Sequence, residues 1–399
     1  MTGLAARVQQ IKPSPTLAIS AKAKAMQAAG IDVINFGAGE PDFDTPEHIK
    51  AAAIQAIQDG FTRYTAVPGI PELKEAIRAK LVRENQLQYK NEEIIVSCGG
   101  KHSFYNLAQA LLDSGDEVII PAPYWVSYPP MVQLAGGVPV IIPTTEEQGF
   151  KITPEQLRQH LSEKTKAVVI NSPSNPTGAA YTRDELQALA AATADYDLLL
   201  ISDEIYEHIV YDGFRQSSVA QLGPAVKERT VILNGVSKSY AMTGWRIGFT
   251  AGPAPLVAAM TKIQSQSTSN PTSISQKAAI AAYNGPQDCI ATMLTAFDER
   301  RRYIVEALNQ IPGVSCFRPQ GAFYAFPRVA GLLGKKFAGE TIGSSLDLCN
   351  LLLEKAKIAA VPGEGFGAPG YLRLSYATSM ANIKAGLERL AAFVDQLSD

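Results

Sequence analysis

Short apolar runs, rich in Val and Ile, alternate with longer amphipathic stretches through the middle of the chain. Each run has the length of a strand that is covered on both faces. Amphipathic stretches such as 103–112 and 183–195 predict helices between them. Strands that alternate with helices predict a mostly parallel sheet flanked by helices on both faces. The seven predicted strands are 94–98, 118–121, 138–142, 167–171, 198–203, 231–234 and 247–251.

The C-terminal part of the chain has a different pattern, with long helical stretches and only short apolar runs. Mixed helices and short strands predict a smaller α+β unit. A stretch rich in Ser and Thr, 264–276, predicts a loop. The C-terminal elements are a helix at 293–310, a helix near 344–355, a Gly/Pro-rich stretch at 362–370 and a final helix from Asn382.

These two patterns predict an α/β protein of two domains. The large domain, with its mostly parallel seven-stranded sheet, covers residues 46–285. The N-terminal segment 1–45 and the C-terminal third, 286–399, form the small α+β domain. A chain of 399 residues is long enough for two such units.

Composition narrows the choice of partners and of compartment. The chain has 36 Lys and Arg against 38 Asp and Glu, a net charge of −2. This balance gives no electrostatic reason to expect nucleic acid or a membrane as partner. The four cysteines form no CxxC pair, and neither a signal-peptide run nor a membrane-spanning run is present in the sequence. We therefore expect a cytoplasmic protein with reduced thiols.

The sharpest chemical signal is the segment 235–248, Gly-Val-Ser-Lys-Ser-Tyr-Ala-Met-Thr-Gly-Trp-Arg-Ile-Gly. Lys238 should emerge where the predicted strand 231–234 ends, which is where α/β sheets build their sites. Small neighbours leave room beside the lysine, and Arg246 offers a guanidinium that can bind a phosphate. The alternative is a pair of surface cations in a loop. The pattern favours a site for an aldehyde cofactor that carries a phosphate.

Two further clusters follow predicted strands. In 171–178, Asn-Ser-Pro-Ser-Asn-Pro-Thr-Gly, Asn175 lies in a rigid turn and can hydrogen-bond a ring oxygen, unless the turn is merely structural. Asp203 comes directly after an apolar strand, so a buried carboxylate is expected. Such a carboxylate needs a cationic partner, and a protonated pyridine nitrogen is one. The alternative for Asp203 is an ordinary helix N-cap.

A glycine pair, Gly99 and Gly100, opens the helix predicted after the first strand. Backbone N–H groups exposed there suit a phosphate, although the spacing is not that of a P-loop. The next histidine, His102, has no partner at metal-ligand spacing, so we expect no metal site. Trp125 follows another strand, where its ring could stack on a planar cofactor or simply pack in the core.

These clusters occur together with Lys12-Pro-Ser-Pro-Thr16, with 37–44 (Gly-Ala-Gly-Glu-Pro-Asp-Phe-Asp) and with 373–378 (Arg-Leu-Ser-Tyr-Ala-Thr). In this order they resemble the fold-type I, class I pyridoxal-phosphate aminotransferases, most closely the bacterial aspartate aminotransferase branch. The resemblance covers essentially the whole chain. It implies pyridoxal 5'-phosphate as cofactor and a homodimer with shared active sites.

The resemblance also implies individual roles. Lys238 would hold the cofactor as a Schiff base and then move the proton at the substrate Cα. Asp203 would pair with the pyridine nitrogen, while Asn175 and Tyr206 would hydrogen-bond the ring oxygen. Tyr64 would reach the phosphate of the neighbouring subunit. The remaining cofactor-binding residues would be Gly99, Gly100, Lys101, Ser237 and Arg246 at the phosphate and Trp125 over the ring.

For the substrate, the resemblance implies that Arg373 grips the α-carboxylate, with Gly39 and Asn175 beside it. Lys101 would meet the distal carboxylate of aspartate or glutamate and of their 2-oxo acids, so these dicarboxylates are the expected partners. Prephenate is a further expected acceptor. Trp125, Lys12 and Thr16 would assist in binding.

Three alternatives remain open. The first is an aminotransferase for other amino acids, and the second is a carbon–sulfur lyase, against which the cation of Lys101 argues. The third is a pyridoxal-phosphate-dependent transcription regulator, against which the early start of the resemblance and the net charge argue. One departure from animal-type relatives stands out, because Gly235 occupies the position of their phosphate-binding serine.

Overall fold

The computed structural model describes residues 3–11 and 15–399, without the side chains of residues 15–17. Its centre is a seven-stranded sheet in the order β2-β8-β7-β6-β5-β3-β4. Strands from β7 to β4 run parallel, whereas β8 runs antiparallel to both β7 and β2. The predicted α/β class and all seven predicted strands are confirmed. The strands are β2 Ile94–Ser97, β3 Glu117–Ala122, β4 Val138–Pro143, β5 Thr165–Asn171, β6 Leu199–Asp203, β7 Thr230–Gly235 and β8 Gly248–Ala251.

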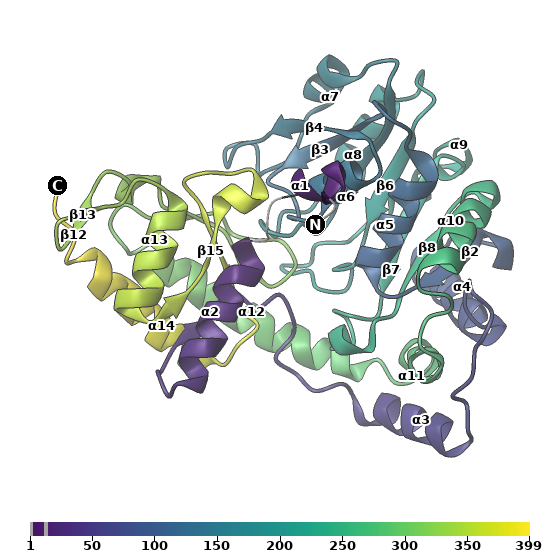
Figure 1. Ribbon diagram of the computed structural model, residues 1–399, viewed down its shortest axis with the longest axis horizontal. Helices are drawn as coiled ribbons and strands as arrows, with labels where there is room; N and C mark the ends of the chain where they lie inside the picture. Colours follow the sequence, from purple (N-terminus) through teal and green to yellow (C-terminus); the bar gives the residue numbers. More distant parts are fainter. Residues whose placement is uncertain (1–2, 12–14) are drawn as a thin grey trace.

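Helices cover both faces of this sheet, because successive residues of each buried strand point to opposite sides. Val169 and Ile201 pack in one core with residues of α5, α6 and α10. Val168 and Leu200 pack in another core, with residues of α7 and α8. Figure 1 shows the resulting three layers. The helices are α3 Glu47–Gln58, α4 Pro71–Asn85, α5 Gly100–Leu111, α6 Tyr128–Leu134, α7 Pro154–His160, α8 Arg183–Ala192, α9 Pro224–Lys227, α10 Ala254–Ser267 and α11 Ser273–Asn284.

The loop predicted at 264–276 is wrong, since α10 extends to Ser267 and α11 already begins at Ser273. The reason is Gln264, whose side chain is fully buried. Its carbonyl accepts hydrogen bonds from Ser97 Oγ (2.8 Å) and Asn106 Nδ2 (3.0 Å), and its amide group donates to two backbone carbonyls. A buried and fully satisfied side chain outweighs the low helix propensity of the surrounding Ser and Thr residues.

Of the remaining elements, α1 lies against α6, and the others gather beside the sheet, around a hydrophobic core shared by residues from both ends of the chain. The strand β1 (Ile34–Asn35) pairs in parallel with β14 (Ile358–Ala359), which joins these two ends directly. The proposed division into domains 46–285 and 1–45 with 286–399 stays a prediction. The helices here are α1 Ala6–Gln9, α2 Pro15–Ala28, α12 Asp288–Leu308, α13 Ser345–Leu351 and α14 Met380–Val394, and the other strands are β9 Ser315–Cys316, β10 Tyr324–Ala325, β11 Pro327–Arg328, β12 Lys336–Phe337, β13 Glu340–Thr341, β15 Val361–Pro362 and β16 Leu372–Ser375.

The final helix, α14, begins two residues before its predicted start at Asn382, and two other helices differ more in their bounds. The helix predicted at 293–310 begins earlier, at Asp288, and ends at Leu308. The helix predicted at 344–355 is α13 followed by a π-helical turn, Leu352–Ala356. Periodicity located both helices, but it does not reveal a change in the hydrogen-bonding pattern within a continuous apolar stretch.

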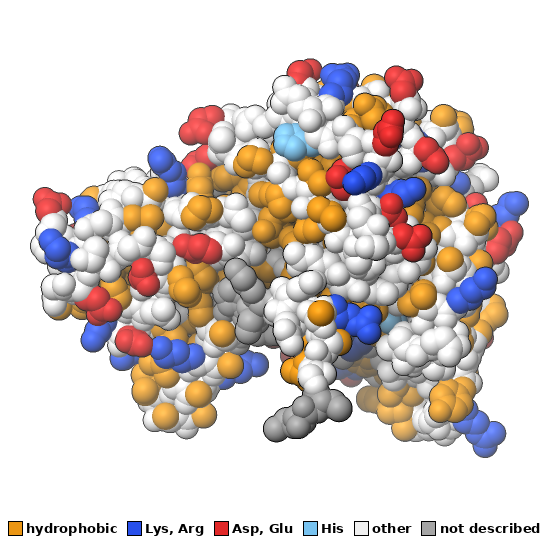
Figure 2. Space-filling view, turned by 45° about the horizontal axis from the view of Figure 1, so that its top comes forward, with side chains coloured by type: hydrophobic (Ala, Val, Ile, Leu, Met, Phe, Trp, Pro, Cys, Tyr) orange, Lys and Arg blue, Asp and Glu red, His pale blue; other side chains and the backbone are white. Residues whose placement is uncertain are grey.

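The surface mixes both signs of charge. On the face drawn in Figure 2, Lys and Arg side chains are interspersed with Asp and Glu, and hydrophobic side chains gather near the middle. Across residues 3–11 and 15–399, no helix combines the length and apolar character that a membrane crossing needs.

Phe297 of α12 gives a test of the shared core. Its ring is fully buried and lies 5.6 Å from that of Phe43 and 5.4 Å from that of Phe323. Phe297→Ala should lower the free energy of unfolding by about 3–5 kcal/mol, because it leaves a cavity among aromatic rings. Denaturant unfolding followed by circular dichroism measures this. The control Val82→Ala, at a half-exposed position of α4, should change it by at most about 0.5 kcal/mol, and an equal loss in both variants would contradict the prediction.

Candidate active site

A cavity of about 1240 Å³ opens at the carboxyl ends of β5, β6 and β7. It is the point at which the strands of an α/β sheet generally place a ligand. Most of the site residues predicted from the sequence meet there, although they come from seven separate segments of the chain. The eleven that line the cavity are Gly39, Gly100, Lys101, Trp125, Asn175, Asp203, Tyr206, Ser237, Lys238, Arg246 and Arg373.

The register of the sheet explains this convergence. Asn171 at the end of β5 lies opposite Asp203 at the end of β6, and β7 continues in the same direction. Ser97 of β2 and Gly235 of β7 both lie opposite Gly248, the first residue of β8. Because β8 is antiparallel to both, its start lies at the same edge as the ends of β2 and β7. The loops after β2, β5, β6 and β7 and the loop before β8 therefore all open on one side.

Lys238 points into this cavity from the turn after β7, and its amine donates a hydrogen bond to the Gly39 carbonyl (2.5 Å). Burial of the amine, with the nearby cation of Arg373, lowers the pKa of Lys238 to about 8. Glu40 opposes this shift. A lysine with such a pKa has a much larger uncharged fraction near neutral pH than an ordinary lysine and can act as a nucleophile or a base.

Asp203 lies at the deep end of the cavity. Tyr128 donates a hydrogen bond to its Oδ2, and the backbone N–H of Ile205 donates to Oδ1 (3.2 Å). Burial raises the pKa of Asp203, although the Tyr128 hydrogen bond and Lys238 oppose the increase. Within the described ranges, Asp203 takes part in no ion pair. A cationic N–H group of a ligand would therefore find an acceptor here.

The opposite end of the cavity is rich in donors for an anion. Gly100 begins α5, where backbone N–H groups lack helical partners, and Ser237 and Arg246 lie at the same end. Gly99 itself does not line the cavity. It has φ +89°, and a Cβ at this position would lie 2.5 Å from Nη2 of Arg246. Gly99 thus allows Arg246 to approach the start of the helix.

Gly235 has a comparable steric reason. A Cβ here would lie 2.8 Å from both Gly248 Cα and the Ile247 carbonyl. A serine at this position would not fit without moving β8, so Gly235 allows β7 and β8 to lie this close together.

Arg373 of β16 is buried on the other side of Lys238. Its Nη1 donates to Asn175 Oδ1 (3.1 Å) and its Nη2 donates to the Gly37 carbonyl (2.9 Å). Its Nε has no hydrogen-bond partner among the described residues, and its guanidinium lies 4.5 Å from the centre of the Tyr324 ring. A guanidinium held in this way, with an unused donor, suits a carboxylate.

Trp125 and Lys101 form the wall on the α5 side. The Lys101 amine lies 5.3 Å from the centre of the Trp125 ring. Partial burial and the neighbouring Arg246 lower the pKa of Lys101. The Trp125 ring packs edge-on against Tyr128 at 5.1 Å, which fixes its plane.

Two predicted residues, Gly99 and Tyr64, do not line the cavity, and Tyr64 is 90% exposed on the surface. Lys12 lies outside the described residues, and the side chain of Thr16 is not described. Their neighbours Gln10 and Ile11 do reach the cavity.

Among the cavity residues that the sequence analysis missed, three make hydrogen bonds at the site. Tyr128 bonds Asp203, Tyr324 bonds the hydroxyl of Tyr206 at 2.8 Å, and Glu40 accepts from Thr243 Oγ1 at 2.8 Å. Tyr128 lies only three residues after Trp125, and this short spacing could have indicated that Tyr128 also belongs to the site. Tyr324 lies in an apolar run far along the chain, so nothing local indicated its position.

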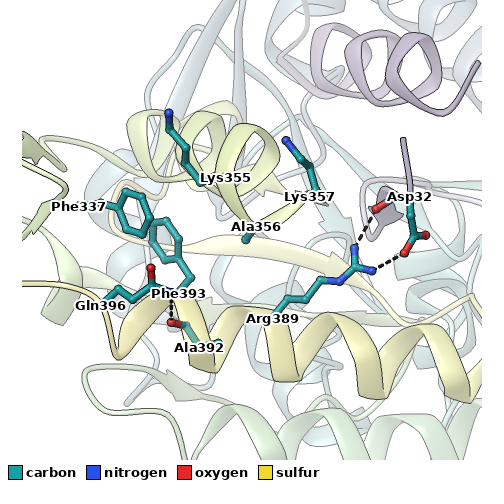
Figure 3. A pocket seen from close by; sticks show the side chains of 9 residues that line it. All are labelled: Asp32, Phe337, Lys355, Ala356, Lys357, Arg389, Ala392, Phe393 and Gln396. Carbon is teal, nitrogen blue, oxygen red and sulfur yellow. Dashed lines mark hydrogen bonds and ion pairs between the residues drawn. The ribbon is translucent and has the colours of Figure 1, made fainter. Parts of the chain in front are cut away.

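A second, smaller pocket of about 440 Å³ lies between α14 and the turn after α13 (Figure 3). Arg389 there is paired with Asp32, and the rings of Phe337 and Phe393 stack at 4.6 Å. None of the site residues predicted from the sequence lines it. The chemistry of the chain is therefore concentrated in the large cavity.

Residues 31–390 match the family model described as aminotransferase class I and II. The chain belongs to this family. It is 54% identical over 395 residues to the aspartate aminotransferase of Geobacillus stearothermophilus, covering 98% of this chain and 99% of that protein. It is 53% identical over 394 residues to the aspartate/prephenate aminotransferase of Nitrosomonas europaea, with the same coverage.

Solved structures agree. The aspartate aminotransferase from Rhizobium meliloti superposes with a TM-score of 0.96 at 50% identity, covering all of both chains. The aspartate aminotransferase from Thermus thermophilus with maleate superposes with a TM-score of 0.92 at 44% identity, covering 98% of this chain and all of that one. The resemblance inferred from the sequence is confirmed, and this protein is an aminotransferase.

The aminotransferase's Lys238 should titrate near pH 8 in the cofactor-free protein. Because the uncharged amine reacts, its acylation rate should rise through pH 8 and level off about one unit higher, well short of the ordinary lysine value of about 10.4. Peptide mapping by mass spectrometry gives the rate at each pH, with exposed Lys164 as reference. Identical profiles for the two lysines would contradict the assignment.

Proposed function

We propose that this aminotransferase moves the amino group reversibly between L-aspartate or L-glutamate and 2-oxoglutarate or oxaloacetate, in a ping-pong reaction with pyridoxal 5'-phosphate. The observation that carries the proposal is the placement of Lys238, Asp203 and Arg373 around one cavity. A reactive amine, a buried carboxylate that has no ion-pair partner among the described residues, and a carboxylate-binding guanidinium are the groups that this chemistry needs.

The cavity fits the cofactor in three respects. Asp203 offers a buried acceptor for a pyridine N–H, and the open space beside Gly100, at the start of α5, leaves room for a phosphate. The Trp125 ring packs at a steep angle against Tyr128 and would stack on the planar ring of the cofactor. When bound, pyridoxal phosphate supplies an aldehyde that links to an amine and a ring that accepts electron density.

The protein's own groups have distinct tasks around it. Lys238 would bind the aldehyde carbon and later carry the proton at the substrate Cα, for which a lowered pKa is required. Asn175 and Tyr206 would orient the ring oxygen. Gly99, by its close packing, would hold Arg246 in place, and the phosphate would be bound by Gly100, Lys101, Ser237 and Arg246.

A dicarboxylic substrate would be held at both ends. Arg373, with Asn175 and the Gly39 backbone, would bind the α-carboxylate, and Lys101 would bind the distal one. Relatives that carry the name aspartate aminotransferase, at 54% identity, support this choice. So does the Thermus thermophilus structure with maleate, because maleate is a small dicarboxylate.

Prephenate is a second proposed acceptor. The cavity of about 1240 Å³ has room beyond that for a four-carbon acid, and the Nitrosomonas europaea relative is named an aspartate/prephenate aminotransferase. Lys12 and Thr16 would contribute to binding at the mouth, where Gln10 and Ile11 already lie.

We infer a homodimer in which the exposed Tyr64 reaches the phosphate of the neighbouring subunit. Its four cysteines, Cys98, Cys289, Cys316 and Cys349, are all free, which suits a cytoplasmic enzyme.

The deciding experiment is a single-turnover panel of amino acids on the purified holoenzyme, followed by visible absorbance. Aspartate and glutamate should rapidly abolish the visible absorbance band of the bound cofactor, and 2-oxoglutarate should restore it. Lys238→Ala should lose the visible band, and its turnover should fall by at least about a thousandfold. Retained turnover in this variant would reject the role of Lys238, and a cofactor unmoved by dicarboxylates would redirect the search to aromatic or sulfur-containing substrates.

Lys101 should determine preference for a second carboxylate. Lys101→Ala should lower kcat/KM for aspartate about ten- to a hundredfold, because a charge-assisted hydrogen bond is lost. For alanine or phenylalanine, kcat/KM should fall far less, since those substrates lose only the contact of Lys101 with the phosphate. Lys101→Arg, which keeps the charge, is the matched control and should retain most of the preference. An equal loss for every substrate would instead assign Lys101 to the phosphate alone.

A further inference from the structure

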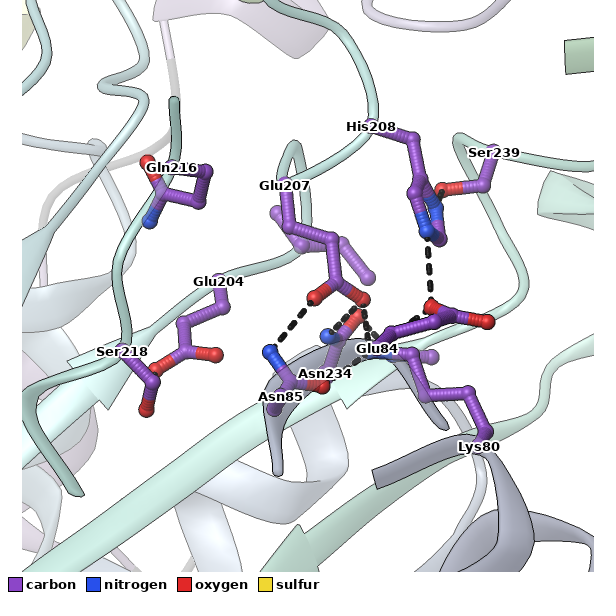
Figure 4. A network of polar contacts seen from close by, with 12 residues as sticks. Lys80, Glu84, Asn85, Glu204, Glu207, His208, Gln216, Ser218, Asn234 and Ser239 are labelled. Atoms are coloured by element: carbon purple, nitrogen blue, oxygen red, sulfur yellow. Dashed lines mark hydrogen bonds and ion pairs between the residues drawn. The ribbon is translucent and has the colours of Figure 1, made fainter. Parts of the chain in front are cut away.

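A network of buried polar groups lies behind the cavity, between α4 and the turn that carries Lys238 (Figure 4). The end of β6 and the loop after it separate the cavity from α4 and contribute side chains to both sides. Asp203 and Tyr206 face the cavity, whereas Glu207 and His208 contact α4. None of these α4 contacts is used by the chemistry proposed above.

His208 bridges the two elements with both of its ring nitrogens. Its Nε2 lies 2.9 Å from Glu84 Oε2, near the end of α4. Its Nδ1 lies 2.9 Å from the hydroxyl of Ser239, the residue directly after Lys238. Ser239 is buried, and His208 is half-buried.

The protonation of Glu84 fixes the direction of these hydrogen bonds. Burial favours a raised pKa, but the hydrogen bond from His208 and the nearby Lys80 outweigh it and lower the pKa of Glu84 to about 2. An ionised carboxylate only accepts, so Nε2 carries a proton. In the neutral ring Nδ1 then accepts from Ser239, and in the charged ring it donates to the same hydroxyl. The bridge therefore persists in both states.

A second connection lies on the other side of Lys238. Lys80 of α4 is fully buried and donates to Glu207 Oε1 at 2.5 Å. The same oxygen accepts from Asn234 Nδ2 at 2.6 Å, and Asn234 Oδ1 accepts from the Gly235 N–H at 2.7 Å. The turn of Lys238 is thus held from α4 both before and after the lysine.

Glu84, Glu207 and His208 have the mutual spacing of a metal site. Lys80 already supplies the cation in this cluster, because its amine also lies 3.4 Å from Glu84 Oε2. The cluster is therefore explained by the protein's own charges.

We propose that His208 is a positioning residue for Lys238, tying the lysine's turn to α4 through Ser239 and Glu84. The inference rests on the proposed role of Lys238 in catalysis. An amine must be placed within a fraction of an ångström of the atoms it acts on, and a shift of about 1 Å can reduce the rate by about a hundredfold. The Ser239–His208 hydrogen bond restrains the residue next to that amine.

The test uses His208→Phe, which keeps a ring but removes both hydrogen bonds, and Ser239→Ala, which removes a single hydroxyl. In each holoenzyme, kcat for aspartate should fall about tenfold while KM changes by less than about twofold. In each cofactor-free protein, the pH midpoint for acylation of Lys238 should rise from its wild-type value, because the amine samples solvent. The double variant should be no slower than the slower single variant, since both remove one connection.

His160→Phe is the matched control, because this histidine lies on α7, bonds only the Gln156 carbonyl among the described residues and does not line the cavity. It should leave kcat and the acylation midpoint unchanged. Thermal unfolding of every cofactor-free variant separates loss of fold from loss of position. If His208→Phe unfolds, the result for Ser239→Ala alone tests the proposal. A wild-type kcat together with a wild-type pH midpoint for Lys238 acylation in Ser239→Ala would overturn it.

Failure of the proposed function looks different. Borohydride reduction of the wild-type holoenzyme followed by peptide mapping should recover the cofactor on Lys238. Its absence there would reject the function itself. Its presence, together with unaffected kcat and midpoint in Ser239→Ala, would reject only the role of His208.

Discussion

Three charged side chains share the interior of one cavity, and the cost of burying them constrains the rest of the structure. Lys238 and Arg373 are both cations, and their proximity lowers the pKa of Lys238. Asp203, the nearest carboxylate at depth, is oriented by Tyr128 and the Ile205 N–H and not by either cation. Buried charges that are held apart in this way remain available to a ligand, whereas a direct ion pair would satisfy them internally.

Holding such charges apart requires rigid supports, and the sheet provides them. Asp203 ends β6 and Lys238 follows β7 at one edge of the seven-stranded sheet, whose strands are fixed in register by their hydrogen bonds, and Arg373 comes from β16 of a separate three-stranded sheet. The glycines at 99, 235 and 248 bring β7, β8 and the start of α5 closer together than side chains would allow. The same backbone contacts therefore pack β7, β8 and α5 closely and place the start of α5, which suits an anion, at the cavity.

The sequence predicted what depends on local pattern. Apolar runs located all seven strands, and polar residues just after those runs located Asn175, Asp203 and Lys238, because strand ends are where function and burial meet. Residues brought in by tertiary packing were missed. Tyr324 reaches the cavity from β10 and Gln264 extends a helix that Ser and Thr residues alone would not favour. Their roles depend on partners more than a hundred residues away, which no local pattern encodes.

The loop after β6 shows why the cavity and its support are difficult to separate. Within six residues it places Asp203 and Tyr206 toward the ligand and Glu204, Glu207 and His208 away from it. Burial and the neighbouring Glu207 carboxylate raise the pKa of Glu204 to about 7, and hydrogen bonds from Ser202 and Ser218 oppose this rise. A change on the α4 side of this loop therefore moves backbone that also carries the cavity's deepest carboxylate. Precise placement of Lys238 and Asp203 depends on polar contacts that never touch a substrate.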